Sequence, residues 1–191
     1  MLQKILMPVY ELAAHQRAHE IAQFVKPKTR ILDLGTGHGA LAHVLQKKLS
    51  ADVVGIDVRD GRKWDIDFLV FDGENLPFED KSFDSTVIVF VLHHASNFRK
   101  LLHEAARVTR DAIVIYEDTP ANAFERKLCA AHGASFNKTF GIKNGTTFLS
   151  EEEWLREFNA VNFSVVSNKP AGPANPIYMT RRRMFVVTPH E

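Results

Sequence analysis

The residues best suited to ligand chemistry lie in one short run, Arg30–Leu41, which reads RILDLGTGHGAL. An apolar strand that carries Asp33 leads into Gly35, Gly37 and Gly39, and then into a helix. Glycine adopts φ values that side chains disfavour, and it lets backbone N–H groups approach a ligand closely. The helix adds unpaired N–H donors at its N-terminus. This run therefore predicts a site for a nucleotide-like ligand.

Two kinds of ligand are compatible with this spacing. With Ala40 as its last position, the run matches the dinucleotide fingerprint G-x-G-x-x-A. Read from Asp33 as D-x-G-x-G-x-G, it resembles the first motif of the class I S-adenosylmethionine (SAM) dependent methyltransferases. The carboxylate of Asp33 would attract the sulfonium and ammonium cations of SAM, whereas it would repel the negatively charged pyrophosphate of a dinucleotide. Asp33 has an alternative role, bracing the turn by accepting backbone N–H bonds, and both roles can hold together.

Apolar strands and helical stretches alternate along most of the chain. Helical spacing over Val9–Val25 predicts a leading helix. The strands are then expected at 30–34, 53–57, 68–71, 85–92 and 112–116, and the helices at 40–49 and 98–108. This order predicts a parallel sheet with right-handed crossovers, whose ligands bind at the carboxyl ends of the strands.

The pattern changes after Asp118. Thr119 and Pro120 are expected to start a helix that Gly133 stops, and the following loop carries Phe136, Phe140 and Phe148. We interpret 118–150 as an insert that covers the substrate, whose aromatic side chains either select an apolar acceptor or belong to the core.

A capping box at Ser150–Glu153 predicts one more helix. Two late strands, 163–167 and 183–188, are joined by a proline-rich loop, Lys169–Pro176, that lacks a helical pattern, which favours an antiparallel hairpin. The resemblance then implies an α/β fold: a Rossmann-like sheet of seven strands with the last one antiparallel and helices on both faces. We expect one domain over residues 1–191.

The chain is similar to the small-molecule, type 11 group of these methyltransferases from about Arg30 to Tyr116. The resemblance implies that Asp57, at the end of VVGIDV, accepts the two ribose hydroxyls of SAM, and that Val58 beside it lines the pocket. A dinucleotide enzyme needs the same acid, so Asp57 does not separate the two kinds of ligand.

The segment FDGENLPFEDKSFDSTVIV does separate them. It resembles the D-x-x-x-L-P-F…F-D pattern of the family, in which Asp72 accepts from the adenine amino group and the Gly73 N–H lies near a ring nitrogen. Dinucleotide enzymes lack this block. A turn around Pro77 ahead of a strand is the alternative interpretation.

A further match, VFVLHHASN, ends the fourth strand. It implies Val91 as a cofactor contact and His94 or His93 as a general base, with His94 slightly favoured. A histidine here can equally cap or line the start of a helix. Glu117 and Asp118 end the next strand, where a solvated strand end is the preferred interpretation over contact with the acceptor.

The connection between Asp57 and Asp72 departs from the family. Only 14 residues separate the two acids, too few for a crossover helix with its loops. We expect the helix to be lost or reduced to a turn, although family members usually shield the adenine face from this side. Trp64 is a candidate to cover the adenine face instead.

Composition narrows the partners. The 191 residues carry 24 Lys and Arg against 23 Asp and Glu, a net charge of +1, which argues against a nucleic-acid or anionic membrane partner. The longest apolar run, Val87–Leu92, is far short of a membrane span. A single cysteine, Cys129, argues against disulfides and cysteine-rich metal sites and favours a cytoplasmic setting. We expect no metal, and the oligomeric state is not predicted.

The leading hypothesis is transfer of a methyl group from SAM to a small-molecule acceptor that the sequence does not identify. A non-catalytic SAM-binding module is the alternative, motivated by the shortened connection after Asp57. A nicotinamide-dependent reductase is the third, and no hydride-transfer site is recognisable for it.

Overall fold

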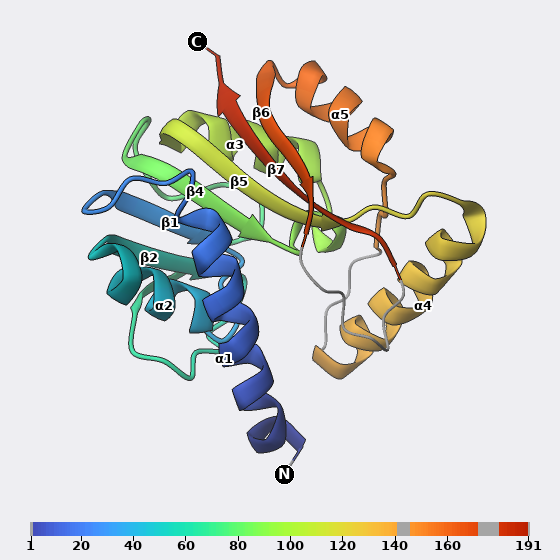
Figure 1. Cartoon of the computed structure of the whole chain (residues 1–191), viewed down its shortest axis with the longest axis horizontal. Helices are drawn as coiled ribbons and strands as arrows, with labels where there is room; N and C mark the ends of the chain where they lie inside the picture. The colour runs from blue at the N-terminus through green and yellow to red at the C-terminus, as the bar shows by residue number, and fades with distance from the viewer. Residues whose placement is uncertain (1, 141–145, 172–179, 191) are drawn as a thin grey trace.

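A seven-stranded mixed sheet forms the centre of the molecule (Figure 1). The computed structural model describes residues 2–140, 146–171 and 180–190. The strand order is β3-β2-β1-β4-β5-β7-β6. Strands β1 to β5 pair in parallel, and β7 pairs antiparallel with both β5 and β6. The predicted fold class, with its reversed last strand, is confirmed.

The elements follow one another as the alternating pattern predicts. In chain order they are α1 (Leu2–Ile21), β1 (Arg30–Leu34), α2 (Ala40–Leu49), β2 (Asp52–Asp57), β3 (Asp67–Val70), β4 (Phe83–Val89), the 3-10 turn η1 (Leu92–His94), α3 (Phe98–Val108), β5 (Thr109–Asp118), α4 (Ala123–Phe140), α5 (Glu151–Ala160), β6 (Phe163–Pro170) and β7 (Arg182–Pro189).

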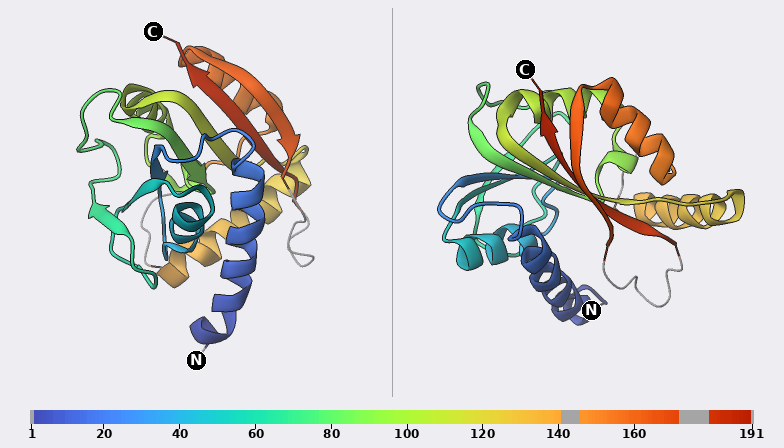
Figure 2. Two further views of the ribbon diagram at one scale, coloured as in Figure 1. Left: turned by 60° about the vertical axis from the view of Figure 1, so that its left-hand side comes forward. Right: turned by 45° about the horizontal axis from the view of Figure 1, so that its top comes forward.

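Helices cover both faces of the sheet (Figure 2). Ala18 and Ile21 of α1 pack with Leu45 of α2 on one face. On the other face, Leu102 of α3 and Trp154 of α5 belong to a second buried cluster. Because the parallel strands have apolar side chains on both sides, each face needs its own cover of helices.

The connection from β2 to β3 contains no helix, as its length predicts. Ile66 lies in this connection and is 5% exposed. A Cβ added to Gly55, in the middle of β2, would lie 2.9 Å from Ile66 Cδ1 and 2.9 Å from Thr36 Cγ2. The glycine therefore leaves room for Ile66 to cover β2 in the absence of a crossover helix.

The predicted bounds of one strand and one helix are wrong. Strand β4 ends at Val89 rather than at residue 92, because Phe90 adopts a left-handed backbone with φ 58° and turns the chain into η1. Helix α1 begins at Leu2, ahead of the predicted Val9, and ends at Ile21.

The helix after β5 is also displaced from its predicted position. It begins at Ala123, where Asn122 caps it by accepting the Glu125 N–H at 2.9 Å, and not at Thr119. It continues through Gly133 to Phe140, so the predicted loop around 136 and 140 is helical. A Cβ at Gly133 would lie 2.9 Å from Thr146 Cγ2. This glycine therefore permits close packing and does not end the helix.

The capping box and the late hairpin are confirmed. Ser150 accepts from the Glu153 N–H, and Glu153 accepts from the Ser150 N–H. Strands β6 and β7 pair antiparallel, and most of the predicted loop 169–176 lies outside the described residues. None of the helices within the described ranges is both long and apolar enough to cross a membrane.

Replacing Ile66 tests its role as the cover of β2. We expect Ile66→Ala to lower the free energy of unfolding by about 2 to 4 kcal/mol, since it removes buried methyl and methylene groups. Val70→Ala is the control, because Val70 on β3 is 56% exposed. It should change the free energy of unfolding by less than about 1 kcal/mol. Urea unfolding monitored by circular dichroism measures both, and equal effects would contradict the assignment.

Candidate functional site

The carboxyl ends of β1 to β5 lie at one edge of the sheet because these strands are parallel. The glycine turn follows β1, Asp57 ends β2, η1 follows β4 and Asp118 ends β5. Figure 1 shows α1 and α4 on two sides of this edge. The topology therefore brings together all the strand-end residues that the sequence singles out.

The glycine turn packs closely against Val91, in the segment between β4 and η1. A Cβ at Gly35 would overlap the side chain of Val91, and Gly35 has a φ of 76°. Gly37 has a φ of 56°, but a Cβ there would meet nothing within 4 Å. Position 35 is thus closed by packing, whereas position 37 borders open space that a ligand can use.

Asp33 is buried beneath this turn, with the residue 2% exposed. Its Oδ2 accepts the Thr36 hydroxyl at 2.6 Å, and it also bonds with the Ala42 backbone. Burial raises the pKa of Asp33 to about 6; the neighbouring Asp57 acts in the same direction and the Thr36 bond opposes it. The bracing role of Asp33 is thereby observed.

Asp57 links the end of β2 to the glycine turn. Its Oδ2 accepts the Gly37 N–H at 2.9 Å, and its Oδ1 accepts the Val58 N–H at 2.7 Å. Each carboxylate oxygen has a further lone pair, so Asp57 can still accept from a ligand. Val58 is 52% exposed and places an apolar side chain beside it.

Asp72 organises the turn that follows β3. Its Oδ1 accepts the N–H groups of Glu74 and Asn75, at 2.8 and 2.7 Å, and its Oδ2 accepts the Asn75 side-chain amide at 2.7 Å. These bonds, led by the Asn75 backbone, lower the pKa of Asp72 to about 2, so it is ionised at neutral pH. A Cβ at Gly73 would lie 3.1 Å from Val58 Cγ1, so this turn adjoins the end of β2.

The short β2–β3 connection packs onto the glycine turn. The Lys63 N–H donates to the His38 carbonyl at 2.9 Å, and a Cβ at Gly61 would lie 3.3 Å from the Gly37 carbonyl oxygen. Trp64 packs with Ile66 in the cluster on the α1 and α2 face. Its predicted role as an adenine cover stays a prediction.

Glu117 is a functional candidate that becomes evident only in the folded chain. It is fully buried rather than solvated, because η1 folds over the end of β5. Its Oε1 accepts the Leu92 N–H at 2.8 Å, and its Oε2 lies 2.5 Å from Nδ1 of His93. The signal in the sequence is a glutamate one residue before the end of a strand, next to a strand that is followed by a His-His pair.

The two histidines differ in their surroundings. The rings of His93 and His94 lie 4.1 Å apart, and His93 stacks on Phe148 at 4.8 Å. His94 forms a side-chain hydrogen bond with Asn137 of α4. Burial, with a contribution from His93, lowers the pKa of His94 to about 4.

Two arginines at the start of β7 are paired with carboxylates. Arg182 donates to Asp118 at 2.9 Å, and Arg183 donates to Glu151 at 2.7 Å. The guanidinium groups of Arg182 and of Arg17, from α1, lie 4.8 and 5.2 Å from the ring of Phe90. Phe90 therefore contacts two cationic side chains at this edge.

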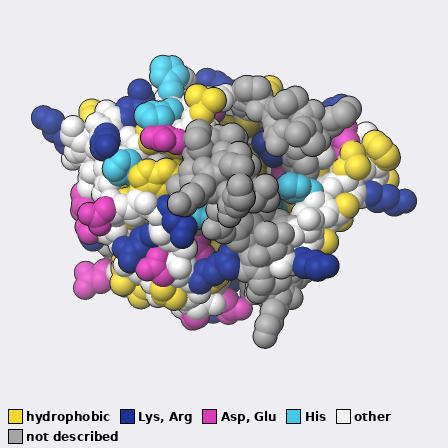
Figure 3. Space-filling model, turned by 90° about the horizontal axis from the view of Figure 1, so that it is seen from below, with side chains coloured by type: hydrophobic (Ala, Val, Ile, Leu, Met, Phe, Trp, Pro, Cys, Tyr) yellow, Lys and Arg dark blue, Asp and Glu magenta, His cyan; other side chains and the backbone are white. Residues whose placement is uncertain are grey.

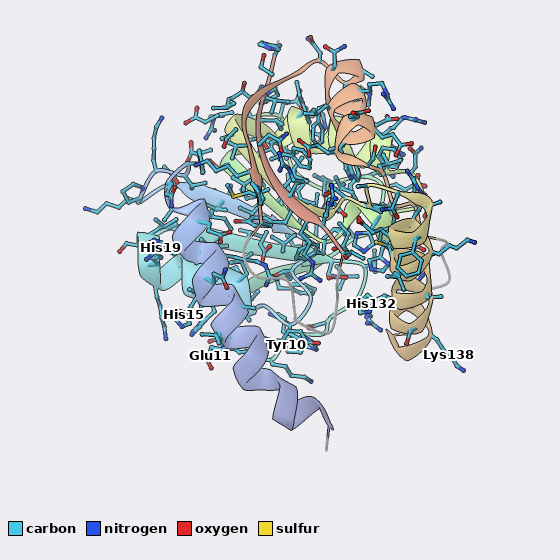
Figure 4. The ribbon with its side chains drawn as sticks, turned by 45° about the vertical axis from the view of Figure 1, so that its right-hand side comes forward. Tyr10, Glu11, His15, His19, His132 and Lys138 are labelled. Carbon is cyan, nitrogen blue, oxygen red and sulfur yellow. The ribbon has the colours of Figure 1, made fainter. Side chains whose placement is uncertain are left out.

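No metal centre is found among the residues that the structure describes. His15 and His19 of α1, the pair with helical spacing, are both exposed (Figure 4). Figure 3 shows basic and acidic side chains interspersed around the undescribed residues on the face seen from below. That face, as far as it is described, has no extended surface of one charge.

Comparison with known proteins agrees with this geometry. Residues 32–115 match the model of a family described as a methyltransferase domain. The demethylmenaquinone methyltransferase of Thermotoga maritima is 33% identical over 132 residues, which cover 64% of this chain and 57% of that protein. The chain spans about half the length of the curated relatives that it matches.

Solved structures share the fold at low sequence identity. The 1,6-didemethyltoxoflavin-N1-methyltransferase of Burkholderia thailandensis, solved with S-adenosylhomocysteine, has a TM-score of 0.71 and 17% identity, covering 94% of this chain and 79% of that one. The [4+2]-cyclase SpnF has a TM-score of 0.72 and 15% identity, covering 93% and 81%. Proteins with different reactions thus share this fold, and the fold alone does not decide the activity.

The raised pKa of Asp33 predicts a pH-dependent effect of Asp33→Asn. Between about pH 4 and 6 the native protein binds a proton that the unfolded chain has lost, so stability falls as the pH rises through this window. Asparagine does not titrate. The stability of Asp33→Asn relative to wild type should therefore increase by about 1 to 2 kcal/mol from pH 5 to 7 and stay constant from pH 7 to 8. Urea unfolding at each pH measures it; a difference independent of pH would refute the assignment.

Proposed function

We propose that this chain, a member of the class I SAM-dependent methyltransferases of type 11, transfers a methyl group from SAM to a small-molecule acceptor. The observation that carries the proposal is the convergence of the glycine turn, Asp57 and the Asp72 turn at one edge of the sheet. These are the positions that the family motifs assign to SAM. The match over residues 32–115 supports the same assignment.

The residues present at this edge fit an adenosyl ligand. Gly37 borders open space, Asp57 retains lone pairs for two ribose hydroxyls, and Val58 offers an exposed apolar side chain to a base. We assign the backbone cradle to Gly35, Gly37 and Gly39. Asp33 supports this turn from below, with Val91 packed against it.

The adenine end of the site is assigned to the turn after β3. Asp72 is ionised and acceptor-only, which suits the adenine amino group, and Gly73 supplies a backbone N–H next to Val58. SAM supplies an electrophilic methyl group, and its transfer in line requires mainly that donor and acceptor be held together. The chain's own task is therefore binding, orientation and exclusion of water.

The acceptor side is assigned to η1 and the segment 118–150. Phe148 packs on His93, and Asn137 of α4 bonds with His94, so described residues of this segment contact η1, which supports the assignment. Such a cover suits an acceptor with apolar surface. The acceptors in the names of the relatives belong to those proteins; for this chain we propose a small molecule, in a cytoplasmic setting, rather than a nucleic acid.

Two measurements decide between this proposal and its alternatives. Calorimetry with SAM, S-adenosylhomocysteine and NADH should give saturable heat with the two adenosyl compounds only. Uptake of NADH alone would favour a reductase. Transfer of labelled methyl from SAM to pooled metabolites should be catalytic, whereas SAM binding without transfer to any of them would favour a non-catalytic module.

Asp57→Ala tests the ribose site directly. We expect SAM binding to weaken by about 1 to 3 kcal/mol, the range for hydrogen bonds to a charged group, as measured by calorimetry. Asp60→Ala is the matched control, because this nearby carboxylate pairs with Arg62 at 2.8 Å, and it should leave the affinity unchanged. Unaltered affinity in Asp57→Ala, with a cooperative thermal melt, would remove Asp57 from the pocket.

A further inference from the structure

His93 and Glu117 form the most deeply buried pair of a basic and an acidic side chain in contact among the described residues, with side chains 6% and 0% exposed. Oε2 of Glu117 lies 2.5 Å from Nδ1 of His93, and Oε1 accepts the Leu92 N–H. An ionised carboxylate only accepts hydrogen bonds, so Nδ1 carries the proton. In neutral His93 the basic nitrogen is therefore Nε2.

The surroundings of this pair limit access by water. Phe148 stacks on the His93 ring with an interplanar angle of 28°, and the Thr147 N–H donates to the His93 carbonyl at 2.9 Å. Arg126 of α4 donates to the Phe148 carbonyl and holds this segment against the helix. A proton transferred at His93 would thus move in a setting of low dielectric constant, where the nearby carboxylate has a strong effect.

We propose that Glu117 holds His93 in one tautomer so that Nε2 removes the proton of an acceptor hydroxyl during methyl transfer. The inference rests on the proposed methyltransferase function and names its substrate class, an alcohol or a phenol. A hydroxyl is a weak nucleophile until it loses its proton, so it benefits most from a base. His93 is then the catalytic base and Glu117 is a positioning residue.

The step balances in atoms and charge. A lone pair of the acceptor oxygen forms the new bond to the methyl carbon, and the electrons of the carbon–sulfur bond return to sulfur, which becomes an uncharged thioether. The hydroxyl proton moves to Nε2 of His93. The imidazolium formed is stabilised by Glu117, which stays ionised, and later releases the proton to solvent.

His93 is better suited to this role than His94, which the sequence analysis favoured slightly. His94 has no carboxylate in its hydrogen bond with Asn137, and its pKa lies at about 4, so it is a weak base. The pKa of His93 shifts in the opposite direction. Burial lowers the pKa of His93, but the attraction of Glu117 outweighs it and raises the pKa overall.

The charged groups around His93 come from four elements. They are Glu117 and Asp118 on β5, Arg182 on β7, His94 on η1 and His132 on α4, whose ring projects toward the sheet edge in Figure 4. Asp118 adds to the effect of Glu117, and Arg182 opposes it. Because only neutral His93 accepts a proton, the rate of methyl transfer should rise with pH through its raised pKa.

Nitrogen-15 NMR of the histidine rings tests the tautomer without any acceptor. In wild type we expect His93, assigned by its absence in His93→Gln, to be protonated at Nδ1 and to titrate above pH 6.5. Glu117→Gln can still accept the Leu92 N–H, but its amide must donate to Nδ1, which moves the proton to Nε2. Glu157→Gln is the control: the Glu157 carboxylate bonds Arg99 of α3, so its replacement should leave the signals of His93 unchanged.

Either of two NMR results would overturn the inference: a wild-type His93 protonated at Nε2, or an unchanged His93 tautomer in Glu117→Gln. Circular dichroism and the melting temperature show whether each variant is folded. Glu117→Asp, which retains the charge, should keep the wild-type tautomer.

Methyl-transfer kinetics test the substrate class with three probe acceptors: catechol for a hydroxyl, benzylamine for an amine and thiophenol for a thiol. We expect transfer from SAM to catechol, with kcat about 100-fold lower in Glu117→Gln, partial recovery in Glu117→Asp, and SAM affinity within twofold of wild type. The pH dependence of kcat assigned to His93 should disappear in Glu117→Gln. Preferential methylation of benzylamine or thiophenol, or an unaltered pH profile, would overturn the hydroxyl class.

Failure of this inference is distinguishable from failure of the proposed function. If SAM does not bind, calorimetry rejects the methyltransferase while the NMR experiment still reports the tautomer of His93. If SAM binds and the tautomer is inverted, only the role of Glu117 and His93 is rejected.

Discussion

One interaction recurs at the edge of the sheet and organises the site: a carboxylate at the end of one strand accepts a backbone N–H from the turn after the neighbouring strand. Asp57 on β2 accepts from Gly37 after β1, and Glu117 on β5 accepts from Leu92 after β4. Turns of this kind leave N–H groups without intrahelical partners, and a buried acceptor stabilises them. Both turns therefore depend on a neighbouring strand for their conformation.

This dependence explains how the chain tolerates a short connection between β2 and β3. The glycine turn is held by Asp57 from the side and by Thr36 bonded to Asp33 from below. Ile66 covers β2, with Gly55 leaving room for it. The connection also bonds the turn through the Lys63 N–H. The role of a helix is thus divided between a buried side chain and backbone contacts.

The two halves of the edge differ in chemical character. Around Asp57 and Asp72 the carboxylates are partly exposed and bonded to backbone N–H groups, which suits recognition of hydroxyl and amino groups. Around Glu117 the carboxylate is fully buried and bonded to an imidazole. Burial there strengthens the coupling of the two charges and makes the protonation of His93 depend on Glu117.

Sequence by itself determined the features that depend on local spacing: the glycine turn, the capping box at Ser150, the alternation that gives a parallel sheet, and the absence of a helix after Asp57. These follow from backbone conformation and from the length of chain available. The sequence did not predict the features that depend on contacts between segments far apart in the chain. Gly133 lies inside α4 because Thr146 and Phe148 need its space, and Glu117 is buried because η1 folds over it. Burial and hydrogen-bond partners are properties of the packed chain, and only the tertiary structure supplies them.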